Sequence, residues 1–180
     1  TDNRRQRQMC IRDRTTSENT NSETIIKKID RFKNYLEKQP FILLARPCDS
    51  VYESRTSRNK FEKNLEIIIS RGLLNLEIPW KDDDIWKDIM INLKNKYKHI
   101  QLGSASLVNK KSIDDSIKVG LNFSMMRFWQ KDLFIYAKDN NHLLIPGIKK
   151  LKELKETIAS NCKIIKMFPI SEKEKSINLE

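Results

Sequence analysis

Apolar residues along the chain form two alternating patterns, one with helical spacing and one of short continuous runs. After Ser22, a residue type typical of helix N-caps, apolar side chains recur at helical spacing over 25–36, and this predicted helix ends near Pro40. A continuous apolar run follows at 41–46. The two patterns then alternate along the chain. They predict further strands at 73–80, 100–107, 122–127, 142–148 and 163–168, and further helices at 61–72, 83–97, 112–119, 131–138 and 150–160.

Alternating strands and helices indicate a parallel sheet, whose strands are covered by helices and therefore read as apolar on both faces. Six βα units of similar length fit two architectures, an open doubly wound sheet and a (β/α) barrel. A nucleotide-binding open sheet carries a glycine-rich turn after its first strand, but this chain reads Arg46-Pro47-Cys48-Asp49 there. The sequence therefore favours a (β/α) TIM-barrel-like fold.

Two charged residues interrupt apolar strands. Lys166 lies between Ile165 and Met167, and Glu77 lies between Leu76 and Ile78. A buried ammonium or carboxylate must be paired, hydrated or neutralised. Because desolvation favours the neutral amine, which attacks carbonyl carbons, this pair suggests Schiff-base chemistry with a proton shuttle.

Other polar residues stand near the predicted carboxyl ends of strands, where barrels place their catalytic groups. These are Arg46, Ser104 with Ser106, and Arg127. Alternation along the strands puts Glu77 and Lys166 on faces that converge if both point into the barrel. The alternative is that such residues extend to solvent from the strand ends without any role in chemistry.

Four segments, in order and with matching spacing, resemble the class I aldolase family that cleaves 2-keto-3-deoxy-6-phosphogluconate and 4-hydroxy-2-oxoglutarate. Leu76-Glu77-Ile78 resembles the family's Leu-Glu-Val strand, and residues 103–109 (Gly-Ser-Ala-Ser-Leu-Val-Asn) resemble its Gly-Ala-Gly-Thr-Val-Leu-Asn. Residues 144–148 match its Leu-Ile-Pro-Gly-Ile, and residues 165–169 (Ile-Lys-Met-Phe-Pro) resemble its Phe-Lys-Phe-Phe-Pro.

The resemblance implies a role for each matching residue. Lys166 would be the catalytic nucleophile that forms the imine, and Glu77 would be the catalytic residue that moves protons. Ser106 stands where the family has a threonine that contacts the pyruvoyl part of the substrate. Arg46 matches an arginine suited to holding a carboxylate as a bidentate partner.

The chain also departs from the family pattern. Lys81 stands where the family has an arginine, and Met126-Arg127-Phe128 replaces its Ser-Pro-Gly turn, so Lys81 and Arg127 are the remaining candidate substrate-binding residues. Eight strands close such a barrel. We expect six βα units with the last two of eight missing, either because the gene is truncated or because the protein is a C-terminally shortened relative closed by another means. An activity that survives this loss would favour a small unphosphorylated 2-oxo acid as substrate.

The chain contains more basic than acidic residues, and part of this excess is concentrated near the N-terminus. The formal net charge is +11, and residues 4–14 hold five arginines against one aspartate. We expect 1–21 to be disordered or an artefact resembling translated sequencing-adapter sequence, with a basic arm that binds nucleic acid or lipid as the alternative. Residues 22–171 would form the barrel domain, and 172–180 a polar tail.

Cysteine and histidine are too few and too scattered for a metal site. Cys10, Cys48 and Cys162 show no paired spacing, and His99 and His142 are the only histidines. We therefore expect no metal and no cofactor, and a reduced, cytoplasmic protein. No apolar stretch has the length of a membrane span and no signal peptide is recognised, so no membrane partner is expected.

Three hypotheses of function follow. The first is a lyase that cleaves a 4-hydroxy-2-oxo acid to pyruvate- or glyoxylate-type products through Lys166, with a homo-oligomer (a trimer) implied by the resemblance. The second is a catalytically degenerate, aldolase-like binding protein, favoured by the altered turn at Arg127. The third, nucleic-acid binding, rests on net charge alone and is the weakest.

Overall fold

A computed structural model describes residues 24–167, in which seven helices alternate with short strands. The predicted segments 1–21 and 172–180 lie outside the described residues, as do Ser22, Cys10 and Phe168. The helices are α1 (Ile25–Lys38), α2 (Ser50–Glu53), α3 (Arg55–Ser70), α4 (Asp84–Lys96), α5 (Lys110–Lys118), α6 (Lys131–Asp139) and α7 (Leu151–Ala159). The strands are β1 (Leu43–Leu44), β2 (Asn75–Pro79), β3 (Gln101–Leu107), β4 (Phe123–Met126), β5 (Leu144–Ile145), β6 (Gly147–Ile148) and β7 (Lys166–Met167).

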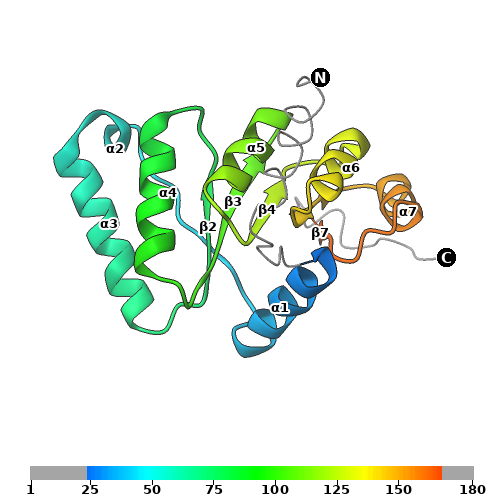
Figure 1. The fold of residues 1–180 in the computed structure, drawn as a ribbon, viewed down its shortest axis with the longest axis horizontal. Helices are drawn as coiled ribbons and strands as arrows, with labels where there is room; N and C mark the ends of the chain where they lie inside the picture. The colour runs from blue at the N-terminus through cyan, green and yellow to red at the C-terminus, as the bar shows by residue number, and fades with distance from the viewer. Residues whose placement is uncertain (1–23, 168–180) are drawn as a thin grey trace, which may run out of the picture.

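The strands pair in parallel and in chain order. One sheet runs β1-β2-β3-β4-β5, and a second pair joins β6 to β7. A doubly wound sheet would reverse its strand order at a switch point, whereas a barrel adds each strand next to the one before it. The chain therefore forms a partial (β/α) barrel, as the sequence predicts, and α3 to α7 follow one another along it in Figure 1.

The predicted strands are present but shorter at their ends, and one is divided. Residues 142–148 form β5 and β6, which are separated by Pro146. Proline has no N–H to donate to a neighbouring strand, and the Pro146 carbonyl instead accepts a bond of 2.9 Å from the backbone N–H of Lys166. This break turns the chain from the main sheet toward β7.

The helix predictions differ from the structure mainly at the N-terminal ends. The N-cap position of α1 is Thr24. Helix α5 begins at Lys110, after Asn109, whose side chain accepts a bond of 2.9 Å from the Ser112 N–H, so the predicted start at 112 is two residues late. The short helix α2 was not predicted, because four residues are too few to show helical spacing.

Two apolar layers lie on opposite faces of the sheet. The outward side chains of β2 and β3, Leu76, Ile78 and Leu102, pack with α3 and α4 around Trp86 and Met90. A further outer cluster joins β4 and β5 to α5 and α6.

The inner face is covered by α1. Phe32 of α1 packs against Phe123 of β4, with ring centroids 4.8 Å apart in an edge-to-face arrangement, and both side chains are fully buried. Gly103 of β3 is the register partner of Phe123, and a Cβ atom on Gly103 would overlap that ring. The absence of a side chain at 103 thus gives the Phe123 ring its place in the interior.

Candidate active site

Glu77 lies in the middle of β2 on the inner face of the partial barrel. Its neighbours Leu76 and Ile78 point outward into the core under the helices, so strand alternation directs Glu77 the other way. Its register partner on β3 is Gly103, which is also the partner of Phe123. No side chain on β3 therefore separates Glu77 from the buried aromatic layer, and Glu77 is only 4% exposed.

Burial determines the electrostatics of Glu77. Removal of the carboxylate from water raises the pKa of Glu77 above its ordinary value, and the positive charge of Lys166 partly offsets this rise. The carboxylate oxygen Oε2 is buried and has no hydrogen-bond partner among the described residues. The protonated form of Glu77 is therefore favoured more than in an exposed glutamate.

Lys166 comes to Glu77 from β7, at the far end of the described chain. Its ammonium nitrogen Nζ is 3.8 Å from Glu77 Oε1, which is within ion-pair range but longer than a direct charged hydrogen bond. The Lys166 side chain is 34% exposed, against 5% for that of Glu77. The sequence-based expectation that these two charges converge matches this geometry, with the amine at the open side and the carboxylate beneath it.

The backbone around Gly147 fixes the position of β7. Gly147 of β6 is the register partner of Lys166. A Cβ atom on Gly147 would overlap the backbone carbonyl oxygen of Arg127, so the end of β4 approaches β6 as closely as a bare backbone permits. The close approach brings the β6–β7 pair against the main sheet, and with it the Lys166 side chain.

Three candidate substrate-binding residues lie at or just beyond the carboxyl ends of β1, β3 and β4. Arg46 is exposed just beyond β1, next to Ala45, whose N–H donates to the Glu77 carbonyl at 2.9 Å. Ser106 is half-buried at a register shift in β3 and has a φ of 61°. Arg127 is exposed, with its guanidinium 5.5 Å from the centroid of the Phe128 ring.

Lys81 contacts groups of α2 and its N-terminal side. Its ammonium group donates to Asp49 Oδ1 at 3.2 Å and lies 3.9 Å from the centroid of the Tyr52 ring. Burial and the nearby carboxylates of Asp83 and Asp49 raise the pKa of Tyr52 to about 12, so this ring stays a neutral phenol. These contacts, made by the unpredicted helix, hold the Lys81 side chain.

Ser104 does not face the interior with Glu77, contrary to its expected place at the rim. Strand alternation turns it toward α5, where its hydroxyl is 2.8 Å from Ser116 Oγ and 2.7 Å from Ser124 Oγ. Ser124 Oγ is in turn 2.7 Å from Nε2 of His142. Sequence reasoning missed this buried polar chain, although the lone serine within the apolar run of β4 is a signal for it.

The described residues contain no group of three His, Cys, Asp or Glu side chains arranged to hold a metal ion. Within the same part of the chain, no helix is long and apolar enough to cross a membrane.

No protein-family model matches the sequence, and no curated protein matches it significantly. Solved aldolase structures resemble it in fold. The 2-keto-3-deoxy-6-phosphogluconate aldolase of Zymomonas mobilis with 3-phosphoglycerate superposes with a TM-score of 0.63 and 16% identity, over 77% of this chain and 61% of that one. A 4-hydroxy-2-oxoglutarate/2-dehydro-3-deoxyphosphogluconate aldolase from TTHB1 gives a TM-score of 0.54 and 16% identity, over 71% and 57% of the two chains.

A third similar structure is the KDPG aldolase of Legionella pneumophila, in which pyruvate was captured as a covalent carbinolamine. It has a TM-score of 0.54 and 21% identity, over 58% of this chain and 50% of that one. The chain thus spans about three-fifths or less of the length of these structures. At these identities the likeness concerns the fold, and the chain has a partial form of the (β/α)-barrel architecture of 2-keto-3-deoxy-6-phosphogluconate aldolases.

Proposed function

We propose that the chain is a class I aldolase-type lyase that acts on a 4-hydroxy-2-oxo acid through an imine on Lys166. The observation that carries the proposal is the approach of Lys166 Nζ to 3.8 Å from Glu77 Oε1 on the inner face of the barrel. It is supported by the fold shared with aldolases, one of which holds pyruvate as a carbinolamine.

The proposed reaction starts with the neutral amine of Lys166. Its lone pair adds to the 2-oxo carbon to give a carbinolamine, and the carbinolamine hydroxyl leaves as water after it receives a proton from the Glu77 carboxyl. The Glu77 carboxylate then takes the proton of the substrate's 4-hydroxyl. The bond between carbons 3 and 4 breaks, an aldehyde leaves, and the electron pair enters an enamine on the protonated imine nitrogen.

The second half of the cycle restores the enzyme. Glu77 returns its proton to carbon 3 of the enamine, and water hydrolyses the resulting iminium to pyruvate and free Lys166. The raised pKa of Glu77 suits this exchange, because the carboxyl must be able to hold a proton near neutral pH and to release it again. Arg46, exposed beside the carboxyl end of β1, is the proposed partner of the substrate carboxylate.

Borohydride reduction in the presence of pyruvate tests the proposal. We expect a reduced pyruvate adduct on the peptide that carries Lys166, and its loss in Lys166→Arg, which keeps a cation beside Glu77 but forms no imine. Lys163→Met removes a lysine of the same segment and should leave the adduct unchanged. A folded wild-type chain without an adduct on Lys166 would contradict the proposal.

A second candidate, an aldolase-like binding protein without turnover, is favoured by the side chain of Lys81. Its contacts with Asp49 and Tyr52 direct a candidate substrate-binding cation to α2. This candidate predicts that pyruvate-type acids bind with no cleavage of any 4-hydroxy-2-oxo acid. Cleavage that disappears in Lys166→Arg would exclude it.

A further inference from the structure

The segment that leads to Lys166 also forms a wall of a cavity between α1, α6 and the start of β5, here called the α1–α6 cavity. Its volume is about 160 Å³. Apolar side chains form most of its surface, among them Ile25, Ile26 and Ile29 of α1, Phe134 of α6, and Leu143 and Leu144. Neither Glu77 nor Lys166 is among the residues that line this cavity.

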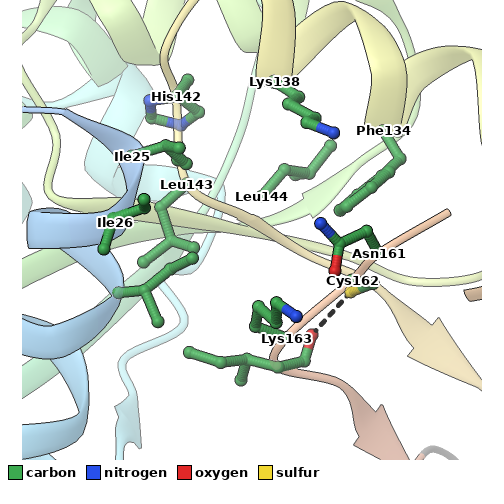
Figure 2. A pocket seen from close by; sticks show the side chains of 12 residues that line it. Ile25, Ile26, Phe134, Lys138, His142, Leu143, Leu144, Asn161, Cys162 and Lys163 are labelled. Carbon is green, nitrogen blue, oxygen red and sulfur yellow. Dashed lines mark hydrogen bonds between the residues drawn. The ribbon is translucent and has the colours of Figure 1, made fainter. Parts of the chain in front are cut away.

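Both lysines that line the α1–α6 cavity lie on one side of it. Figure 2 shows Lys138 and Lys163 there, above and below the amide of Asn161, with Ile25, Ile26, Leu143 and the ring of His142 on the other side. No aspartate or glutamate is present among the described residues that line it. The structure also gives neither lysine an ion pair within residues 24–167.

This combination defines the chemistry of an occupant. An apolar cavity of about 150 Å³ accommodates a ring of the size of benzene. Two lysines on the wall, with no carboxylate among the described residues that line the cavity, complement a negative charge on such a body. We propose that the α1–α6 cavity binds a small carboxylate whose hydrocarbon part has about the size of a benzene ring.

The reaction rate of the Cys162 thiol can be used to measure how much of the α1–α6 cavity is occupied by ligand. Its side chain lines the cavity and is half-buried, and its thiol donates to the Ile164 carbonyl at 3.1 Å (Figure 2). Burial raises the pKa of the Cys162 thiol, so its reaction with a thiol reagent is slow even in the empty cavity. A ligand in the cavity should slow this reaction further.

Calorimetric titration of the full chain with 3-phenylpropionate tests the proposal. We expect saturable binding by 3-phenylpropionate and much weaker binding by 3-phenylpropan-1-ol, which has the same hydrocarbon body without the charge. Lys138→Met and Lys163→Met should each weaken binding roughly two- to fivefold, since each removes one exposed cation. Lys60→Met, which removes an exposed lysine from α3 at the other end of the molecule, is the matched control and should have no effect.

The labelling rate of Cys162, measured in a Cys10→Ser, Cys48→Ser background, should fall in proportion to saturation. Binding should persist in Lys166→Met, which separates this site from the proposed imine chemistry. Equal binding of the alcohol, no binding of the acid, or affinity unchanged in both cavity-lysine variants would overturn the proposal. Sedimentation showing an oligomer that shields Cys162 without any ligand would overturn it as well.

Discussion

Acid is expected to destabilise this fold through His142, which is 3% exposed and belongs to the buried chain of serines. Each serine hydroxyl has a single proton to donate. Ser116 donates to the Ser112 carbonyl, so Ser104 must donate to Ser116, and Ser124 must donate to Ser104. Nε2 of His142 is then left as the donor to Ser124, which identifies the neutral Nε2–H tautomer as the native form.

The magnitude follows from the pKa of His142. Burial, aided by the positive charge of Lys28, lowers the pKa of His142 from 6.5 to about 4. Between these values the unfolded chain binds the proton and the native chain does not, so the free energy of unfolding rises with pH in this window. The contribution is complete above about pH 6.5 and is lost as the pH falls through about 4, which amounts to about 3 kcal/mol.

Urea unfolding measured between about pH 7 and about pH 4.5 tests this value. His142→Gln keeps an amide N–H that can donate to Ser124 but has no ring to titrate, and it should lose about 2 to 3 kcal/mol less than wild type on acidification. His99→Gln removes the other histidine, which is exposed, and should follow wild type. Parallel losses of stability in wild type and His142→Gln would refute the lowered pKa of His142.

Three further predictions concern the paired charges and the backbone beneath them. Glu77→Gln should lower the rate of aldol cleavage about 10²- to 10⁴-fold, because proton transfer by a positioned carboxyl contributes about this much, and steady-state kinetics would detect it. Lys166→Met should raise the pKa of Glu77 further, since Lys166 is the charge that lowers it. The free energy of unfolding should then fall more steeply than in wild type as the pH rises above 4.5, the ordinary pKa of glutamate. Carbon NMR of the Glu77 carboxyl would measure the shift. Gly147→Ala should destabilise the fold by about 1–3 kcal/mol in thermal unfolding, because its Cβ overlaps the Arg127 carbonyl. This loss of stability should exceed that of Gly103→Ala, whose Cβ overlaps only a side chain, the Phe123 ring.

The architecture could be predicted from the sequence because each strand keeps its apolar side chains in a continuous run. The positions of Glu77 and Lys166 followed from the same rule, since alternation fixes the face on which a strand residue lies. Alternation does not determine the direction of a side chain that lies beyond the end of a strand. Lys81 follows β2, and its orientation depends on Asp49 and Tyr52 in and before a helix too short to be recognised by its spacing.

Ser104 shows a second limit of the sequence. It was grouped with the rim residues because it is polar and near the end of its predicted strand, yet it shares the outward face of β3 with Leu102. Its partners come from α5 and β4, at Ser116 and Ser124. A buried serine is hydrogen-bonded both in a polar network and at a functional site, and only the three-dimensional partners distinguish the two.

The difference in exposure between Glu77 and Lys166 is the feature on which the proposed chemistry depends. An amine that attacks a carbonyl must be reached by substrate, and its side chain is 34% exposed. The carboxyl that carries the proton needs a water-poor place that keeps its pKa high, and its side chain is 5% exposed. The packing that sustains this difference comes from α1, whose Phe32 covers Phe123 on the inner face, and from Gly103, which leaves no side chain between that ring and Glu77. In this partial barrel, a helix outside the βα repeat therefore covers the inner face on which Glu77 lies, as the proposed proton shuttle requires.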